Sequence, residues 1–309
     1  MAAGRRIFVL GGGAALGAHH VGALRYLEEQ GITPDVVVAS SIGVINACAY
    51  ATGGVEQLAR AWRGFRSLPR IISPSLWQNP ILGLSLFSMD RLTAAVEQYM
   101  DFPKIHASPL DLHVVVLNLS RGRGEVWSKH DCADARELRT LSRAGYAIPL
   151  LFPPVRFRGD WYVDGGFAWN IPLDHCLTLE PSEIYLLAPI ASQLPYTGRF
   201  RTFAGFVQRL LDVMWRTIGN MGYLYAAMED QRFHGVPVTV IEPTEQWSGF
   251  GPLAIFHAHP RKNENLIAAG YRDAKRAIAV RRRRETRVRP VHRATVHAVA
   301  TPPADGAGP

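Results

Sequence analysis

Hydrophobic and polar positions near the start of the chain follow two different periods. Arg5–Leu10 and Asp35–Ala39 are short apolar runs rich in β-branched residues, which are typical of buried strands. Between them, apolar residues recur at helical spacing over Ala18–Leu27, and Gly31 is a natural stop. A second helix is predicted over Ile42–Gly54. Strand, glycine turn, helix, strand, sharp turn and helix predict a parallel α/β fold.

The rest of the chain continues this alternation. Further strands are predicted at Asp111–Leu119, Gly124–Trp127, Trp161–Val163, Glu183–Leu187 and Val238–Ile241, and further helices at Val55–Phe65, Arg91–Met100, Ala133–Arg143 and Phe203–Met228. The segment Arg66–Ser88 has no clear period and predicts a surface excursion. From about Glu285 the chain is basic and then rich in Ala, Pro and Gly, which predicts disorder. We expect one domain over residues 1–280 and a basic, disordered tail over residues 281–309.

Length, charge and cysteine content limit the classes of protein that fit. The chain has 309 residues, of which 48% are hydrophobic, enough for one large α/β domain. No apolar run approaches the ~18 residues of a membrane-spanning helix. Residues 261–293 hold 12 Lys and Arg against 3 Asp and Glu, and the remainder is nearly neutral. A nucleic-acid enzyme more often carries positive charge around its site, so we expect no nucleic-acid partner. Three isolated cysteines favour a reducing compartment over a disulfide framework or zinc site.

A serine follows the second predicted strand in the segment Ala-Ser-Ser-Ile-Gly over residues 39–43. Ser41 would occupy a sharp strand-to-helix turn, with its hydroxyl beside the positive N-terminus of the next helix. Such a turn crowds the backbone, which explains the small neighbours Ala39 and Gly43. Serine is also a common helix N-cap, so this motif alone leaves nucleophile and cap both open.

Glycines at positions 11, 12, 13 and 17 form a second motif after the first strand. Their backbone N–H groups, unobstructed by side chains, could hold an anion at a helix N-terminus, either a phosphate or the oxyanion of acyl transfer. The dinucleotide fingerprint GxGxxG fits badly, because Leu16 stands where its last glycine should be. A plain tight turn stays open as an alternative.

The third motif is Asp164-Gly165-Gly166, which follows a hairpin whose turn is predicted at residues 158–160. An aspartate at a strand end before two glycines can be held rigidly, with its carboxylate aimed at a neighbour. A capping or turn aspartate is the alternative.

Together the three motifs supply a nucleophile, a carboxylate base and an oxyanion hole, the parts that acyl transfer requires. Their type and order strongly resemble the patatin-like phospholipase family. The resemblance rests on LGGGAALGAHHVGAL, ASSIGVINA and WYVDGGFAWNIP, and covers roughly residues 5–190.

The resemblance implies a three-layer α/β/α fold with a mainly parallel central sheet, and a Ser-Asp dyad without a catalytic histidine. Ser41 would be the nucleophile and Asp164 its base in the hydrolysis of phospholipids or other lipid esters. These parts require no metal and no organic cofactor. The oxyanion hole would consist of Gly11, Gly12, Gly13 and Ala14, with supporting glycines at Gly17, Gly43, Gly165 and Gly166.

The chain departs from the family pattern at three positions. Ala14 stands where the family usually has its third glycine, Leu16 where it often has Arg or Lys, and Ala39 at the first glycine of the serine motif. A methyl group at position 14 disfavours a positive φ angle. The alternative of a catalytically weak or inactive lipid-binding or regulatory protein therefore stays open.

Histidines offer a different catalytic interpretation. Ser41, Asp164 and His175 occur in the order of an α/β-hydrolase triad, but the serine follows only the second strand and His175 comes soon after Asp164. His19 and His20, at the start of the first helix, are interpreted as surface residues.

The run Arg281–Arg284 ends a predicted helix. Cations at a helix C-terminus are favourable in themselves. They would also attract anionic lipid headgroups, by roughly 1 kcal/mol per residue near the surface. These arginines leave peripheral contact with an anionic membrane surface as an option. From the isolated cysteines we expect a cytoplasmic protein, and from the family resemblance a lipid ester as substrate.

Overall fold

The computed structural model describes residues 4–65, 73–74, 85, 87–192, 231–244 and 259–288, with isolated positions between 202 and 228. The strands are β1 (Arg5–Leu10), β2 (Val36–Ala39), β3 (Ser73–Pro74), β4 (Phe87–Ser88), β5 (Asp111–Asn118), β6 (Arg123–Ser128), β7 (Val155–Phe157), β8 (Asp160–Asp164), β9 (Pro181–Leu187), β10 (Arg232–Phe233) and β11 (Val236–Ile241). The helices are α1 (Ala18–Glu29), α2 (Ile42–Gly64), α3 (Asp90–Glu97), α4 (Phe102–Ala107), α5 (Ala135–Gly145), α6 (Leu173–Leu177) and α9 (Pro260–Val288).

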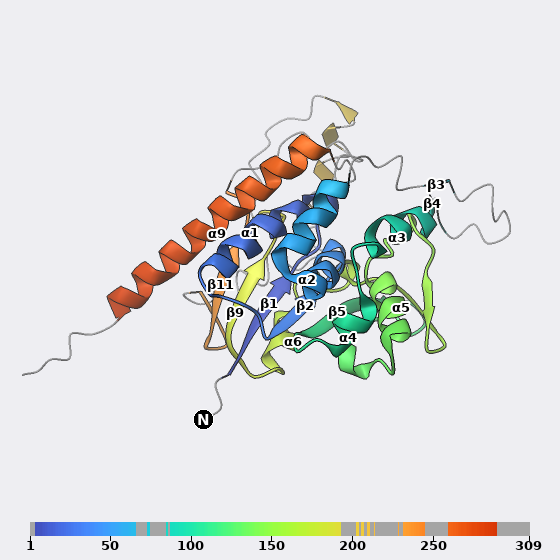
Figure 1. Ribbon diagram of the computed structural model, residues 1–309, viewed down its shortest axis with the longest axis horizontal. Coiled ribbons are helices and arrows are strands. Elements are labelled where there is room, and N and C mark those ends of the chain that lie inside the picture. Colours follow the sequence, from blue (N-terminus) through green and yellow to red (C-terminus); the bar gives the residue numbers. More distant parts are fainter. Residues whose placement is uncertain are drawn as a thin grey trace, which may run out of the picture.

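A mixed sheet forms the centre of the described part (Figure 1). Its strand order is β10-β11-β9-β1-β2-β5-β8-β7, with β6 also paired to β5. The neighbours β11, β9, β1, β2 and β5 run parallel, and the remaining strands pair antiparallel. The α/β class with a parallel centre is therefore confirmed.

Helices cover the two faces of the sheet unequally. Side chains of α1, α2, α5 and α9 pack on one face in the larger core cluster, which includes Phe8, Val37 and Val116. On the opposite face, α6 contributes Leu173 and Cys176 to a smaller cluster. Among the described helices, α6 alone forms the helical layer on this second face of the sheet.

The strand β5 brings distant parts of the chain together. Because β6 pairs with β5 along residues 113–118 on one edge, β2 and β8 must share the opposite edge. There β2 places Ala39 opposite Val114, and the antiparallel β8 places Asp164 opposite Val116. The end of β2 and the end of β8 therefore meet, and Ser41 lies two residues beyond Ala39.

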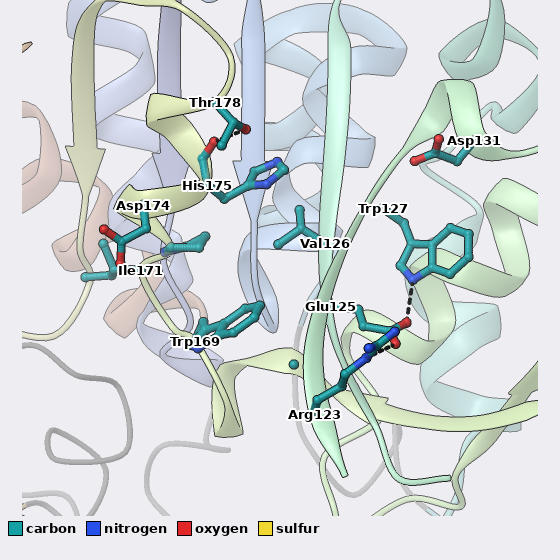
Figure 2. A pocket seen from close by; sticks show the side chains of 12 residues that line it. Arg123, Glu125, Val126, Trp127, Asp131, Trp169, Ile171, Asp174, His175 and Thr178 are labelled. Carbon is teal, nitrogen blue, oxygen red and sulfur yellow. Dashed lines mark hydrogen bonds and ion pairs between the residues drawn. The ribbon is translucent and has the colours of Figure 1, made fainter. Parts of the chain in front are cut away.

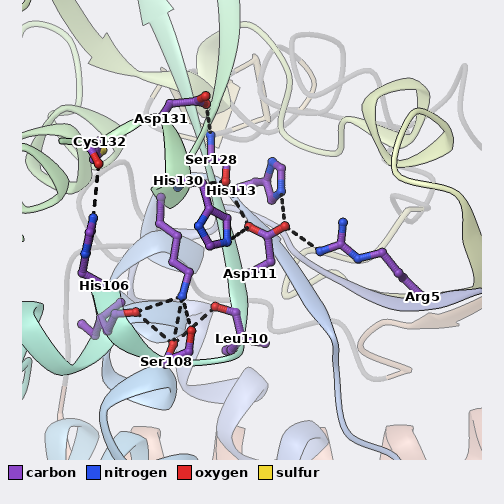
Figure 3. A network of polar contacts seen from close by, with 12 residues as sticks. Arg5, His106, Ser108, Leu110, Asp111, His113, Ser128, His130, Asp131 and Cys132 are labelled. Carbon is purple, nitrogen blue, oxygen red and sulfur yellow. Dashed lines mark hydrogen bonds and ion pairs between the residues drawn. The ribbon is translucent and has the colours of Figure 1, made fainter. Parts of the chain in front are cut away.

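A polar network fixes the other end of β5 (Figure 3). The carboxylate of Asp111 accepts hydrogen bonds from Arg5, at 2.6 Å, and from Ser128, at 3.0 Å. These contacts, together with the neighbouring His113, hold the pKa of Asp111 well below its usual range, against the opposing effect of burial. The network ties β5 to β1 and β6, far from the Ser41 end.

The C-terminal boundary expected at residue 281 is corrected, because α9 continues as a helix to Val288. Arg281 is held by an ion pair with Glu183, at 2.6 Å, and by an i,i+4 pair with Glu285, at 2.8 Å. These contacts favour continuation of the helix. Most of the helix predicted at Phe203–Met228 lies outside the described residues, as do residues 289–309. Among the described helices, none is long and apolar enough to cross a membrane.

Candidate active site

Ser41 lies at the strained turn between β2 and α2. Its backbone has φ 53° and ψ −127°, a conformation that non-glycine residues rarely adopt. Strain of this kind costs on the order of 1–3 kcal/mol and persists only where the surroundings enforce it. The Ser41 side chain makes no capping hydrogen bond with the helix. Ser41 therefore does not cap α2 with its hydroxyl group, as the alternative interpretation required.

Glycines make room for this turn. A Cβ atom on Gly43 would stand 2.0 Å from the Leu10 carbonyl oxygen, so no larger residue fits there. A Cβ atom on Gly12 would stand 2.8 Å from the Ser41 Cβ, which places the glycine loop directly against the serine. The backbones of β1 and its loop thus approach Ser41 to a distance that side chains would prevent.

Asp164 ends β8 and is fully buried. Its Oδ1 accepts a hydrogen bond from the Gly166 N–H at 2.8 Å, and its Oδ2 has no hydrogen-bond partner within the described part. Burial raises the pKa of Asp164 to about 7, against the opposing effects of the neighbouring Ser41 hydroxyl and of the Gly166 N–H. A carboxylate with an unsatisfied buried oxygen is a strong acceptor for a nearby proton.

Asn170 joins the glycine loop to the serine turn. Its Oδ1 accepts hydrogen bonds from the Gly12 N–H, at 2.5 Å, and from the Ser40 hydroxyl, at 2.8 Å. The same hydroxyl also lies 2.9 Å from the Asn170 carbonyl oxygen. Sequence reasoning assigned no role to Asn170 or Ser40. The available signal was the position of Asn170 six residues after Asp164, within the segment that resembles the family.

Two of the four N–H groups expected in the oxyanion hole already have acceptors in this structure. The Gly12 N–H is taken by Asn170, and the Gly11 N–H donates to the Leu187 carbonyl at 3.0 Å. In the described structure, the N–H groups of Gly13 and Ala14 have no acceptor. Ala14 has φ 47°, so its methyl group does not prevent the left-handed conformation that was expected to be disfavoured.

His19 and His20 are completely buried, so their interpretation as surface residues is wrong. The His20 ring contacts the Leu187 carbonyl at 3.1 Å and Asn46 at 3.0 Å. Burial and the adjacent His19 lower the pKa of His20 to about 3, so this ring is neutral near pH 7. His19 contacts Asp273 at 3.0 Å. Both rings support the segment that follows the glycine loop.

His175 is not placed as the third member of a triad. Its Nε2 lies 3.1 Å from His113 Nδ1. His113 shares a face of β5 with Val115, whereas Asp164 pairs with Val116 on the other face. His175 instead lines a pocket of about 800 Å³ between β6 and α6, together with Trp169 (Figure 2). Neither Ser41 nor Asp164 lines this pocket.

The fold and this site define an α/β protein in which a serine at a strained strand-to-helix turn lies beside a buried carboxylate. A family model described as patatin-like phospholipase matches residues 8–177. The chain therefore belongs to the patatin-like phospholipase family.

Two sequence relatives match a little more than half of this chain. A lysophospholipase of Emericella nidulans is 29% identical over 186 residues, which are 58% of this chain and 11% of the relative. The human patatin-like phospholipase domain-containing protein 6 is 29% identical over 177 residues, 54% of this chain and 12% of the relative. This chain thus spans about a tenth of the length of these two relatives. The crystal structure of VipD from Legionella pneumophila has a TM-score of 0.45 and 14% identity, and the match covers 90% of this chain and 67% of VipD.

Proposed function

We propose that the protein is a lipid acyl hydrolase that cleaves carboxylic esters through an acyl-Ser41 intermediate. The observation that carries this proposal is the unsatisfied, buried Oδ2 of Asp164 beside the strained Ser41. Family membership and the lysophospholipase among the relatives support a phospholipid or other lipid ester as substrate.

In this mechanism Asp164 removes the Ser41 hydroxyl proton while Oγ attacks the ester carbonyl carbon. The N–H groups of Gly13 and Ala14 stabilise the resulting oxyanion. Collapse of the tetrahedral intermediate releases the alcohol, which takes the proton from Asp164. Water then attacks the acyl-enzyme while Asp164 takes its proton. Collapse of this second intermediate breaks the bond to Ser41 Oγ, which receives the proton from Asp164, and the free acid leaves. Asn170 acts as a positioning residue, because it holds Gly12 and Ser40 together.

The alternative is a weak or inactive family member that binds lipid. The left-handed Ala14 favours it, because a methyl group there adds strain of about 1–2 kcal/mol to the loop that would hold the oxyanion. In either case, exposed cations on α9, including Lys275, Arg276 and Arg283, would attract an anionic membrane surface.

Hydrolysis of a soluble chromogenic short-chain ester tests the dyad. We expect Ser41→Ala and Asp164→Asn each to lower kcat by at least about 10³-fold, because each removes a group that acts only in the chemical step. Asp174→Asn, at an exposed aspartate, is the matched control and should keep full activity. Turnover that survives either active-site substitution would remove the dyad. Absence of turnover in the wild type, with lipid binding retained, would favour the binding protein.

A further inference from the structure

Three exposed apolar side chains lie along the antiparallel part of the sheet, where β6 and β8 flank the C-terminal end of β5. Leu119, Trp161 and Trp169 are 50%, 44% and 43% exposed, although the next strand residue, Tyr162, is buried. We call Leu119, Trp161 and Trp169 the aromatic rim. Large apolar side chains that are exposed together commonly mark contact surfaces.

Direct contacts connect the rim to the strands below it. The Leu119 N–H donates to the Trp161 carbonyl at 2.8 Å. Arg156 pairs with Trp161 across the β7–β8 hairpin, and its guanidinium carbon lies 6.0 Å from the centre of the indole ring. Trp169 packs over β6, where a Cβ atom on Gly124 would stand 3.0 Å from two of its ring atoms.

The rim lies on the face of the sheet that carries α6. Trp161 alternates along β8 with Tyr162 and Asp164, which face the larger core. On β6, Val126 pairs with Val115 of the smaller core. Figure 2 shows Trp169 on the Val126 side of β6.

The rim is also close to the proposed catalytic residues. The antiparallel β8 starts at the rim and runs inward to Asp164, three residues after Trp161. At about 3.3 Å per residue, that separation is about 10 Å. Trp169 directly precedes Asn170, which contacts Gly12 of the glycine loop. A surface in contact with the rim would therefore lie near the site.

We propose that the aromatic rim is the surface by which this protein docks on a phospholipid bilayer. Indole rings favour the membrane interface, where the ring is partly apolar and its N–H reaches water. Arg156 has no carboxylate partner among the described residues, so its guanidinium is free to bind lipid phosphates. The inference rests on the proposed function, because the bilayer would present the ester to Ser41.

A second copy of the chain fits this surface less well. In a symmetric dimer each patch contacts the same patch on the partner. Such a contact would bring the Arg156 side chains of the two copies together, whereas the exposed Arg121 and Arg123 are already paired with Asp160 and Glu125. A lipid phosphate complements the Arg156 guanidinium, whereas the Arg156 of a second copy would repel it.

Co-sedimentation with phosphatidylcholine vesicles tests the proposal without requiring catalysis. We expect the wild type to bind these neutral vesicles at low and at high salt, because apolar insertion is little affected by ionic screening. The double variant Trp161→Ala/Leu119→Ser should lower the partition coefficient about tenfold or more, since it removes the apolar area of two side chains that would be buried in the bilayer. Val280→Ser, which alters an exposed apolar residue on α9, should leave it unchanged.

A second measurement guards against misfolding of the double variant. Brominated lipids should quench tryptophan fluorescence of the wild type, and less so that of Trp161→Phe, which keeps an aromatic ring in place. The soluble ester should be hydrolysed equally by wild type and Trp161→Phe. If the wild type hydrolyses no ester but vesicle binding still needs the rim, the docking surface stands and the proposed function fails.

Three results would overturn the docking surface. The first is vesicle binding that is unchanged in the double variant. The second is binding that requires anionic lipid, disappears at high salt and is lost when Lys275 and Arg276 are replaced by glutamine. The third is a wild-type dimer that Trp161→Ala converts to a monomer, with no vesicle binding by either form.

Discussion

The tertiary structure holds Ser41 in an unfavourable backbone conformation and Asp164 in an unfavourable, buried environment. The backbone of Ser41 is strained at φ 53°, and Asp164 is ionisable yet fully buried. Both features cost stability, and the surrounding strands and glycines maintain them. This combination of local strain and a perturbed carboxyl group is typical of functional sites. Sequence motifs suggested both residues but contained no measure of burial or strain.

Because the pKa of Asp164 is raised to about 7, its protonation should control both activity and stability. Activity requires the carboxylate, so we expect kcat/KM for a soluble ester to rise with pH through about 7. Between about pH 4 and pH 7 the folded protein binds more protons at this site than the unfolded chain, so the free energy of unfolding should fall as pH rises.

Asp164→Asn should remove this pH dependence and make the protein more stable than the wild type at pH 8, because no charge is then buried. Denaturant unfolding at pH 5 and pH 8, beside a pH–rate profile, measures both effects. Equal pH dependence of stability in wild type and variant would show that Asp164 ionises with its ordinary pKa.

At the scale of elements, hydrophobic periodicity predicted the long buried segments and missed the short ones. β1 has the predicted bounds Arg5–Leu10, and the predicted break at Gly53-Gly54 is a real kink inside α2, where Gly54 has φ 67°. The short helix α4 (Phe102–Ala107) and the strand β10 were not predicted. Such short elements have too few residues for a period, and tertiary contacts determine them.

Packing of α1 against α9 depends on glycine at the contact. A Cβ atom on Gly22 would stand 1.8 Å from the Ile267 carbonyl oxygen. We expect Gly22→Ala to force the two helices apart and to lower the free energy of unfolding by about 1–3 kcal/mol. Thermal and denaturant unfolding measure this change, with Ala279→Val on the exposed side of α9 as control. If the free energy of unfolding falls no more than in the control, α1 and α9 accommodate the added methyl group without loss of packing.

At the scale of the molecule, α9 connects the C-terminal part of the chain to the glycine loop. Figure 1 shows α9 lying along α1, the helix that follows this loop. Asp273 on α9 contacts His19 at 3.0 Å and accepts a hydrogen bond from the Thr244 hydroxyl at 2.8 Å. The family model ends at residue 177, yet residues beyond it help to hold the loop.

Asp273→Ala should therefore weaken both stability and turnover. Loss of the carboxylate leaves His19 and Thr244 without their acceptor, at a cost of about 1–3 kcal/mol. We expect kcat to fall while Trp161-dependent vesicle binding persists, because the rim lies on the other face of the sheet. Glu264→Ala, at an exposed position of α9, is the control. Turnover equal to the wild type would show that α9 has no influence on the loop.

The sequence by itself determined the α/β class, the order of the first strands and helices, and the family. These follow from local period and from glycine-rich motifs, which act over a few neighbouring residues. Tertiary structure decided which N–H groups of the glycine loop stay free, that Asn170 joins the loop to the serine turn, and that His19 and His20 are buried. Those properties depend on contacts between segments more than 100 residues apart, such as Gly12 with Asn170. Patterns within a short stretch of sequence cannot predict such contacts.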